Sequence, residues 1–229
     1  MKRVAVFAAA LMTMVASGAS RAAVLFSDDF TEGSYSYTAD TSGGNQGGVG
    51  QALSNGFSRG IKIVNPTLAV DGLDSVTTRV FTGAGGLFDY SSTAGADAAT
   101  LLQYQTTPTS QVTGLTSTSV VHLDFAALDA PVTGPTTVKV VLNPFVSDEW
   151  DSSTYTLDKG GAQTLDIPLT GLSNSYPGTT WMQIWIDTPA GADYRLNSLS
   201  IEASPTPEPA TLGLIGLSAL ALRRRRRRA

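Results

Sequence analysis

The sequence predicts an all-β fold: an antiparallel β-sandwich flanked by an N-terminal signal peptide and a short C-terminal transmembrane helix. Three observations predict it. Short runs of alternating apolar and polar residues recur between Ala23 and Ala203, separated by clusters of Gly, Pro, Asp and Ser. No part of this region shows sustained helical spacing with caps. The two ends differ from it in composition, because each combines basic residues with an uncharged apolar run.

The N-terminal residues have the three parts of a secretory signal peptide. A basic Lys-Arg pair is followed by an apolar run of twelve residues, Val4 to Val15. Small side chains at Ser20 and Ala22 then match the −3 and −1 positions of a cleavage site. We therefore assign residues 1–22 to a signal peptide and expect export through the Sec translocon. Cleavage after Ala19 and a buried N-terminal helix are the alternatives.

Residues 23–203 form the predicted sandwich domain. Four alternating runs each assign one set of side chains to the core. These sets are Val121, Leu123 and Phe125; Val138, Val140 and Leu142; Leu165, Ile167 and Leu169; and Met182, Ile184 and Ile186. A fifth run, "DYRLNSLSIE", has Tyr194, Leu196 and Leu199 among its apolar positions. Two connections interrupt the pattern. The segment Thr41–Gln51 holds five glycines and is predicted to be a loop, and Thr106–Ser119 is a polar connection with a weak edge strand as an alternative.

The net charge of −4 hides an asymmetry between the ends and the middle of the chain. Nine of the fifteen basic residues lie in the terminal segments, so six others face all nineteen acids and leave the middle near −13. So acidic a domain repels phosphate backbones, which argues against nucleic acid as a partner. The sequence contains no cysteine, which excludes thiolate metal sites, redox pairs and cysteine nucleophiles.

The stretch "TTWMQIWIDT" carries the candidate binding residues of the domain. On a strand, Trp181, Gln183, Trp185 and Asp187 point away from the core, and the two indoles lie about 13 Å apart. Flat aromatic rings meet the apolar faces of sugars, and the amide and carboxylate can bind hydroxyls. The sequence therefore predicts a carbohydrate-binding face. The alternative is that both tryptophans are packed under loops or edges.

Two acidic clusters are candidates for a structural calcium ion, the one cofactor that we consider. Asp148, Glu149 and Asp151 surround Trp150, and Asp28 and Asp29 follow the first predicted strand. Carboxylate oxygens are the ligands that calcium prefers. The spacing is not that of an EF-hand loop, and solvated acidic turns are the alternative.

Catalysis is not predicted. The single histidine, His122, shares a strand face with Asp124, but no nucleophile elbow accompanies the pair. One histidine also excludes a multi-histidine zinc site. The alternative is an exported glycan-active enzyme that uses two of the many carboxylates as acid and base.

The C-terminal residues combine a spacer, an apolar run and a basic cluster. Ser204–Pro209 is a stiff, proline-rich spacer. The thirteen uncharged residues Ala210–Leu222 would span about 20 Å as a helix, short of a bilayer core of about 30 Å. The tail 223–229 then begins with Arg223, Arg224, Arg225, Arg226, Arg227 and Arg228, which the positive-inside rule holds in the cytoplasm. A segment that is later removed fits this marginal span, and a permanent anchor is the alternative.

Pro207, Glu208 and Pro209, followed by the apolar run and the arginines, closely resemble the PEP-CTERM sorting signal of exported bacterial proteins. The resemblance covers about the last twenty-five residues. It implies recognition by an exosortase, a membrane-embedded transpeptidase-like protease, and loss of the segment after the motif. It also implies an envelope that produces exopolysaccharide. The chain would lie transiently in the inner membrane and afterwards at the cell surface or in the extracellular matrix.

The first and last predicted strands, "VLFSDDF" and "DYRLNSLSIEA", resemble those of jelly-roll domains of the carbohydrate-binding type. The resemblance implies a jelly-roll-like sandwich and an extracellular polysaccharide as partner. Together these features predict a structural or adhesive surface protein with weak carbohydrate binding. A purely structural envelope protein without a ligand is a third alternative.

Overall fold

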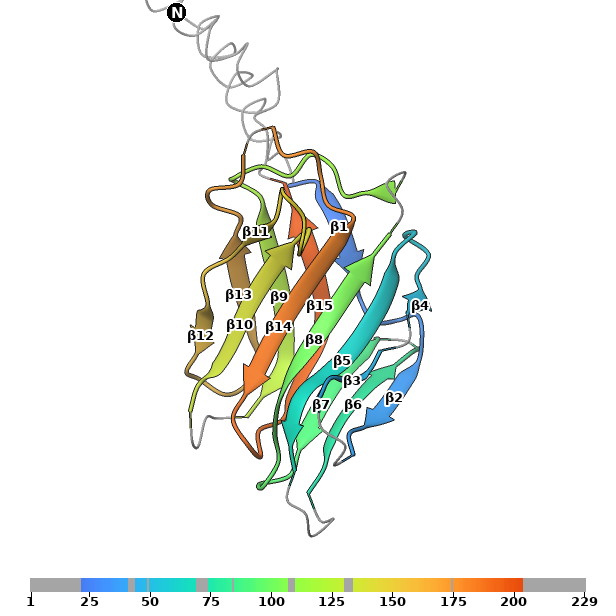
Figure 1. Ribbon diagram of the computed structural model, residues 1–229, viewed down its shortest axis with the longest axis vertical. Helices are drawn as coiled ribbons and strands as arrows, with labels where there is room; N and C mark the ends of the chain where they lie inside the picture. The colour runs from blue at the N-terminus through green and yellow to red at the C-terminus, as the bar shows by residue number, and fades with distance from the viewer. Residues whose placement is uncertain are drawn as a thin grey trace, which may run out of the picture. The chain divides into compact units, whose positions relative to one another are not determined.

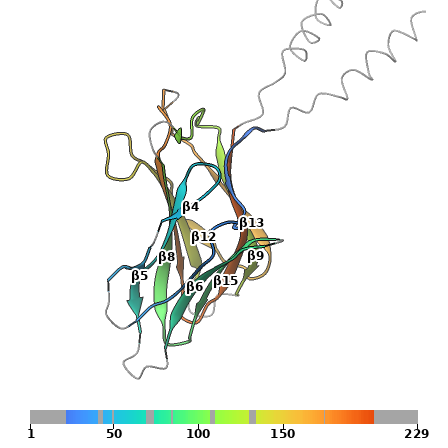
Figure 2. The ribbon, with the colours of Figure 1, turned by 90° about the vertical axis from the view of Figure 1, so that its right-hand side faces the viewer.

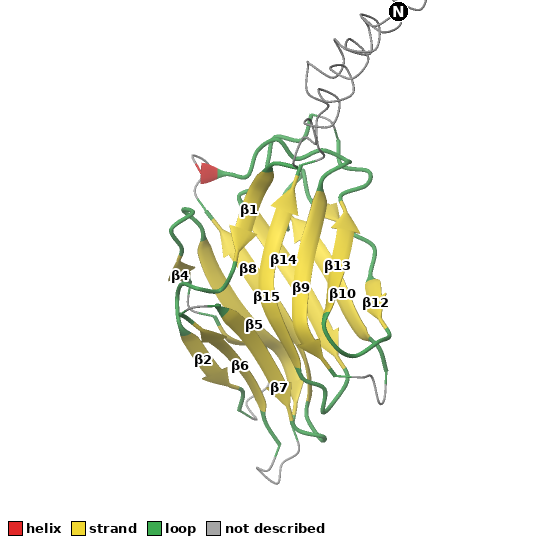
Figure 3. Cartoon of the chain, turned by 180° about the vertical axis from the view of Figure 1, so that it is seen from behind, coloured by secondary structure: helices red, strands yellow, loops and turns green. Residues whose placement is uncertain are grey.

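Two antiparallel sheets face each other in the computed structural model and enclose one hydrophobic core (Figure 1 and Figure 2). The structure describes residues 22–40, 44–48, 50–68, 74–83, 85–106, 110–129, 134–173 and 175–203. Apart from one 3₁₀ position at Ser110, these residues form only strands, turns and loops (Figure 3). The all-β sandwich is therefore confirmed for the body. Residues 1–21 of the predicted signal peptide and all residues from Ser204 lie outside the described ranges.

The first sheet, called sheet A, has seven strands in the order β13-β9-β15-β7-β6-β2, with β1 also paired to β15 (Figure 3). All of its pairings are antiparallel. Its strands are β1 Val24–Asp28, β2 Tyr35–Thr38, β6 Val76–Phe81, β7 Leu87–Ser92, β9 Val120–Leu128, β13 Gln163–Pro168 and β15 Tyr194–Glu202.

The second sheet, called sheet B, has eight strands in the order β11-β10-β14-β8-β5-β3, with β12 also paired to β10 and β4 to β5. It is the sheet that faces the reader in Figure 1. Its strands are β3 Gln46–Gly47, β4 Gln51–Ala52, β5 Ser58–Thr67, β8 Asp97–Gln105, β10 Thr136–Leu142, β11 Trp150–Asp151, β12 Tyr155–Leu157 and β14 Trp181–Thr188.

The predicted alternation of buried and exposed residues is confirmed on the central strands. The residues of β9, β10 and β14 that the sequence predicts to point inward have exposed fractions of 1% or less. The exception among the predicted core residues is Leu165 on the edge strand β13, which is only partly buried. Central strands carry fully buried residues because neighbours cover them on both sides, whereas an edge strand has one open side.

The strand β15 holds sheet A together by pairing with β7 along its first part and with β1 along its second. A bulge at Asn197 lies between the two parts, because the register on β9 passes from Leu196 directly to Ser198. The extra residue shifts the alternation by one position. This explains how Leu196 and Leu199, three residues apart, both point into the core.

The prediction that Thr41–Gln51 is a loop is wrong in part. The structure places two short strands there, β3 and β4, and both pair with β5. Five glycines lower the strand propensity of this segment, but main-chain hydrogen bonds to a long neighbouring strand override a local preference. In Thr106–Ser119 the described residues show no strand, and Val112 forms an isolated bridge with Thr179.

A buried ion pair joins the two sheets. Asp28, the last residue of β1 in sheet A, accepts hydrogen bonds on both oxygens from Arg59 Nη1 on β5 of sheet B, at 2.8 and 2.6 Å. The side chains are 3% and 0% exposed. Asp28 also accepts from the hydroxyl of Tyr104 at 2.8 Å and from the Phe30 amide at 2.9 Å. Each carboxylate oxygen therefore accepts two hydrogen bonds.

The second terminal nitrogen of Arg59, Nη2, fastens the chain that follows β1, whereas Nε is buried and has no hydrogen-bond partner among the described residues. Nη2 donates to the carbonyls of Glu32 and Gly33, at 2.6 and 2.9 Å, and to the Gln51 side chain at 3.2 Å. The guanidinium also lies 5.2 Å from the centre of the Phe30 ring, within cation–π range. One side chain thus connects β1, the turn after it, β4 and β5.

We predict that Arg59→Met lowers the free energy of unfolding by about 3–5 kcal/mol, because it leaves the Asp28 carboxylate buried without a countercharge. Arg195→Met is the matched control, since Arg195 is 58% exposed in its pair with Asp89 and such surface pairs contribute at most about 1 kcal/mol. Urea unfolding of both variants measures the difference. Equal, small losses in the two variants would contradict the role assigned to Arg59.

Candidate functional site

The four residues predicted to bind sugar lie on β14, with their side chains on the face of sheet B that points away from the core. We call this the outer face of sheet B. Met182, Ile184 and Ile186 between them are buried against sheet A. The outer face is not uniform, because Trp181 and Trp185 are partly exposed, Asp187 is exposed and Gln183 is buried. Only two of the four residues meet in one hollow.

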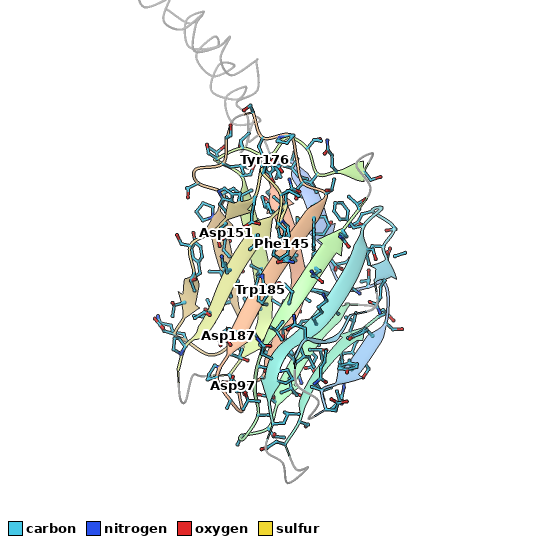
Figure 4. All side chains as sticks on the ribbon, viewed as in Figure 1. Asp97, Phe145, Asp151, Tyr176, Trp185 and Asp187 are labelled. Carbon is cyan, nitrogen blue, oxygen red and sulfur yellow. The ribbon has the colours of Figure 1, made fainter. Side chains whose placement is uncertain are left out.

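Trp185 and Asp187 line a groove of about 440 Å³ on the outer face. Figure 4 shows both on β14, with Asp97 close to Asp187. The walls come from β5, β8 and β10 and from the segment between β11 and β12. The other lining residues are Val64, Asn65, Thr67, Asp97, Ala98, Ala99, Thr137, Lys139 and Thr154.

A bulge in β5 builds one wall of the groove. Val64 pairs with Ala99 and Thr67 with Asp97, so β5 holds one extra residue there. Pro66 lacks the amide that a regular ladder needs, and bulges are where sheets accept proline. Asn65 takes a left-handed backbone with φ 47°, which asparagine tolerates better than most residues. The bulge brings the polar side chain of Asn65 to the groove.

An interruption of the edge builds the opposite wall. Between β11 and β12, Ser152 replaces a strand residue by bonding Val140 twice: its amide donates to the carbonyl and its hydroxyl accepts from the amide, each at 2.9 Å. Thr154 follows on this irregular segment and lines the groove. Lys139 and Thr137 complete the wall from β10.

A hydrogen bond anchors the Trp185 ring between two neighbouring strands. Lys139 and Leu101 are its cross-strand neighbours, and its indole N–H donates to the Gln183 oxygen at 3.2 Å. Gln183 is only 4% exposed, so it acts as a support for the ring rather than as a surface group. Because the N–H is engaged within the protein, Trp185 offers its apolar ring to the groove.

The groove carries a negative charge. Lys139 is the one cationic residue that lines the groove, and its Nζ lies 2.6 Å from a carboxylate oxygen of Asp151, which neutralises its charge. Asp97 and Asp187 also line the groove and leave it negatively charged. Partial burial, and then the charge of Asp97, raise the pKa of Asp187 above its usual range. An anionic ligand would therefore be repelled here.

Trp181 lies outside the groove, near the start of β14. Its ring centre is 5.7 Å from that of Phe145, at an angle of 57°. Its indole nitrogen is buried and has no hydrogen-bond partner among the described residues. The structure therefore separates the two predicted tryptophans: Trp185 lines the groove, and Trp181 supports an exposed ring from a loop.

The candidate calcium ligands are engaged with other groups. Asp28 is saturated by the Arg59 network, and Asp29 accepts from the amide and hydroxyl of Thr31 at 3.1 and 2.6 Å. In the other cluster, Asp148 accepts from Asn143 and Asp151 from Lys139, and Glu149 accepts from the Phe145 amide. No group of three metal-binding side chains occurs in the described ranges.

His122 is paired with acids other than the one its sequence suggests. Nδ1 lies 2.7 Å from Asp166 on β13, and Nε2 lies 3.7 Å from Glu202 on β15. Asp124 instead accepts from Asn197. The neighbours come from adjacent strands, so only the pairing order of β13, β9 and β15 reveals them.

The groove residues that the sequence does not reveal come from other strands, and only strand pairing brings them beside Trp185. The alternation of β10 predicts that Lys139 points away from the core, but its position beside Trp185 depends on the β10–β14 register. Asp97 and Asn65 come from β8 and β5, far along the chain. The Asn-Pro pair inside a strand was the one available signal for the bulge.

Sequence comparison identifies the C-terminal segment. The family model of the PEP-CTERM protein-sorting motif matches residues 205–228, which confirms the resemblance seen in the sequence and implies an exported, exosortase-sorted protein. The matched residues lie outside the described part of the structure, as do Pro207, Glu208, Pro209 and the arginines. No curated protein matches the chain. The described residues contain no helix long and apolar enough to cross a membrane, and the predicted segment 210–222 is not among them.

Several solved structures are similar to the body, all with TM-scores below 0.5. The CBM22-2 xylan-binding domain of Paenibacillus barcinonensis Xyn10C is 14% identical with a TM-score of 0.35, and covers 79% of this chain and 99% of its own. A CBM4 domain is 13% identical with a TM-score of 0.32, and covers 69% and 94%. The enzymatically active domain of bacteriophage CBA120 tailspike protein 4 is 14% identical with a TM-score of 0.34, and covers 66% of this chain but 21% of its own.

We predict that Asp187→Asn stabilises the protein at neutral pH and not in acid. The pKa of Asp187 is raised in the folded protein. Ionisation of its carboxyl group therefore destabilises the folded state at pH values above the pKa of an unfolded aspartate, which is about 3.9. The gain is at most about 1 kcal/mol after solvent screening, and it disappears as the pH falls below that value. Thermal unfolding between pH 3 and pH 7 measures it. Asp158→Asn, an exposed acid outside the groove, is the control, and equal behaviour of both variants would contradict the assignment.

Proposed function

We propose that this chain is an exported bacterial surface or matrix protein, processed by an exosortase at Pro207–Pro209, whose sandwich binds polysaccharide weakly through the outer face of sheet B. Its role is structural or adhesive. The groove that contains Trp185 is the single observation that carries the binding part of the proposal. The match of residues 205–228 carries the sorting part.

The groove has the composition that sugar binding requires. One flat aromatic ring, fixed by Gln183, offers an apolar surface at the centre of a sheet. Asn65, Thr137 and Thr154 around it offer donors and acceptors for hydroxyl groups. The site is a shallow hollow on a sheet rather than an enclosed pocket, which suits part of a long polymer better than a small molecule.

One observation supports hydrolysis as a second candidate function. Asp97 and Asp187 line the same groove, and the pKa of Asp187 is raised, as a general acid requires. A carbohydrate-active site of this kind would release reducing ends from a polysaccharide, and Asp187→Asn would abolish the release. Binding without release supports the first proposal.

Replacing Trp185 tests the binding proposal. The test uses native gels that contain a polysaccharide which slows the migration of the wild-type protein. We expect Trp185→Ala to lose most of this retardation, because an aromatic platform supplies a large part of a sugar contact. Phe81→Ala is the control, since Phe81 is also exposed but lies on the β6–β7 hairpin of sheet A. Equal retardation of wild type and Trp185→Ala would refute the groove as the binding site.

Intact-mass analysis of the protein from its native cell surface tests the sorting proposal. We expect a mature chain that begins near Ala23 and lacks Arg223 to Arg228. The double variant Pro207→Ala, Pro209→Ala should keep the arginines, whereas Pro205→Ala, in the same spacer, should be processed normally. A wild-type protein that retains its arginine tail would contradict exosortase processing.

A further inference from the structure

The loop between β10 and β11 presents an aromatic side chain on the same face as the groove. Phe145 is 80% exposed, more than any other large hydrophobic residue in the described ranges, and Val146 beside it is 52% exposed. A ring this exposed contributes little to the core. Figure 4 shows Phe145 on the face that carries Trp185.

The loop holds this ring in a strained backbone conformation. Phe145 has a φ of 68° and Asn143 a φ of 47°, values that bulky side chains rarely adopt. Such strain persists only where surrounding contacts enforce it, and it is frequent at ligand-binding positions. The exposed ring is thus a maintained feature of the fold.

Asn143 supplies the contacts that enforce the loop. Its side-chain nitrogen donates to Asp148 at 2.9 Å and to the Gly178 carbonyl at 3.0 Å. Its side-chain oxygen accepts from the Thr179 hydroxyl at 2.9 Å and from the Thr180 amide at 3.1 Å. All four hydrogen-bonding positions of the amide are used. Glu149 closes the loop by accepting from the Phe145 amide.

Trp181 connects this loop to the groove. The Phe145 ring packs on Trp181, whose side chain shares the outer face with Trp185 four residues further along β14. Four residues of strand separate the two positions by about 13 Å. Phe145, packed on Trp181, and Trp185 are therefore two aromatic surfaces on one line along β14, with Gln183 and its cross-strand neighbour Gln103 on β8 between them.

The charges along this line favour an uncharged ligand. Asp97 and Asp187 lie at the groove end, and Asp148 and Glu149 belong to the Phe145 loop. The one lysine that lines the groove is neutralised by Asp151. Acidic polysaccharides would meet repulsion at both ends of the line.

We infer that the outer face of sheet B binds a neutral polysaccharide segment that runs along β14 and contacts both rings, with Phe145 as a second platform that selects chains over short oligosaccharides. This rests on the proposed function of the Trp185 groove. A short oligosaccharide reaches Trp185 alone, whereas a longer one reaches Phe145 as well.

Affinity gels with four neutral polysaccharides (hydroxyethylcellulose, xylan, galactomannan and dextran) and two polyuronates (alginate and polygalacturonate) test this inference. Calorimetry then compares the disaccharide and the hexasaccharide of the neutral polymer that retards the protein most. We expect Phe145→Ala to weaken hexasaccharide binding about fivefold and disaccharide binding less than twofold, the size of one aromatic contact. Trp185→Ala weakens both. Phe81→Ala changes neither.

The outcomes separate the two proposals. If Trp185→Ala weakens binding but Phe145→Ala does not, the second platform is refuted and the groove stands. Preferential retardation by the polyuronates refutes the choice of a neutral ligand. If no polysaccharide retards the wild type, both proposals fail. If Phe145→Ala reduces sedimentation with phosphatidylcholine vesicles and leaves glycan binding unchanged, Phe145 is a lipid contact. Phe145→Gly, which relieves the backbone strain, controls for misfolding.

Discussion

The buried pair of Asp28 and Arg59 is the interaction on which the sandwich depends most. The two residues come from different sheets, and neither charge can reach water. A buried ion pair adds little net stability compared with apolar residues, but loss of one partner is severely destabilising. Its structural consequence here is a direct link between the two sheets. The pair fixes where β1 lies relative to β5 and, through Nη2, where the chain turns after β1. Sheets whose apolar faces could slide over each other are held in one alignment.

That alignment leaves the outer face of sheet B free for another use. Because the inner side chains of β14 complete the core, an aromatic residue on the outer side, such as Trp185, can be kept partly exposed at the surface. Two irregularities frame it: the Asn65–Pro66 bulge in β5 and the broken edge between β11 and β12. A third irregularity is the strained loop at Phe145, which places an aromatic ring against Trp181 at the start of β14. Three irregular segments thus border the outer face of sheet B and give it a relief that a regular sheet would lack.

The sequence was sufficient for the features that depend on local pattern. Alternation in "TTVKVVLNPFV" and "TTWMQIWIDT" predicts which side chains of β10 and β14 face the core, and the Pro-Glu-Pro, apolar and arginine segments identify the sorting motif. It was insufficient for features that depend on register. Nothing in the sequence near Asp28 shows that its partner is Arg59, and Trp181 and Trp185 looked equivalent although only Trp185 lines the groove. The glycine-rich segment 41–51 contains strands because β5 offers a long edge to pair with, which no local propensity encodes.

The indole N–H signals of the three tryptophans in an ¹⁵N-labelled sample test the central claim most directly. Each tryptophan reports on a different place: Trp185 on the groove, Trp181 on the support of Phe145, and Trp150 on the sheet edge, where its N–H donates to Thr170. The sample is titrated with the hexasaccharide of a neutral polysaccharide that retards the protein in affinity gels. The chemical shift of the Trp185 signal should change most and that of Trp181 less, and the Trp150 signal should stay in place. A Trp185 signal that does not move at millimolar hexasaccharide, or that moves no more than the Trp150 signal, would contradict a polysaccharide site on the outer face of sheet B.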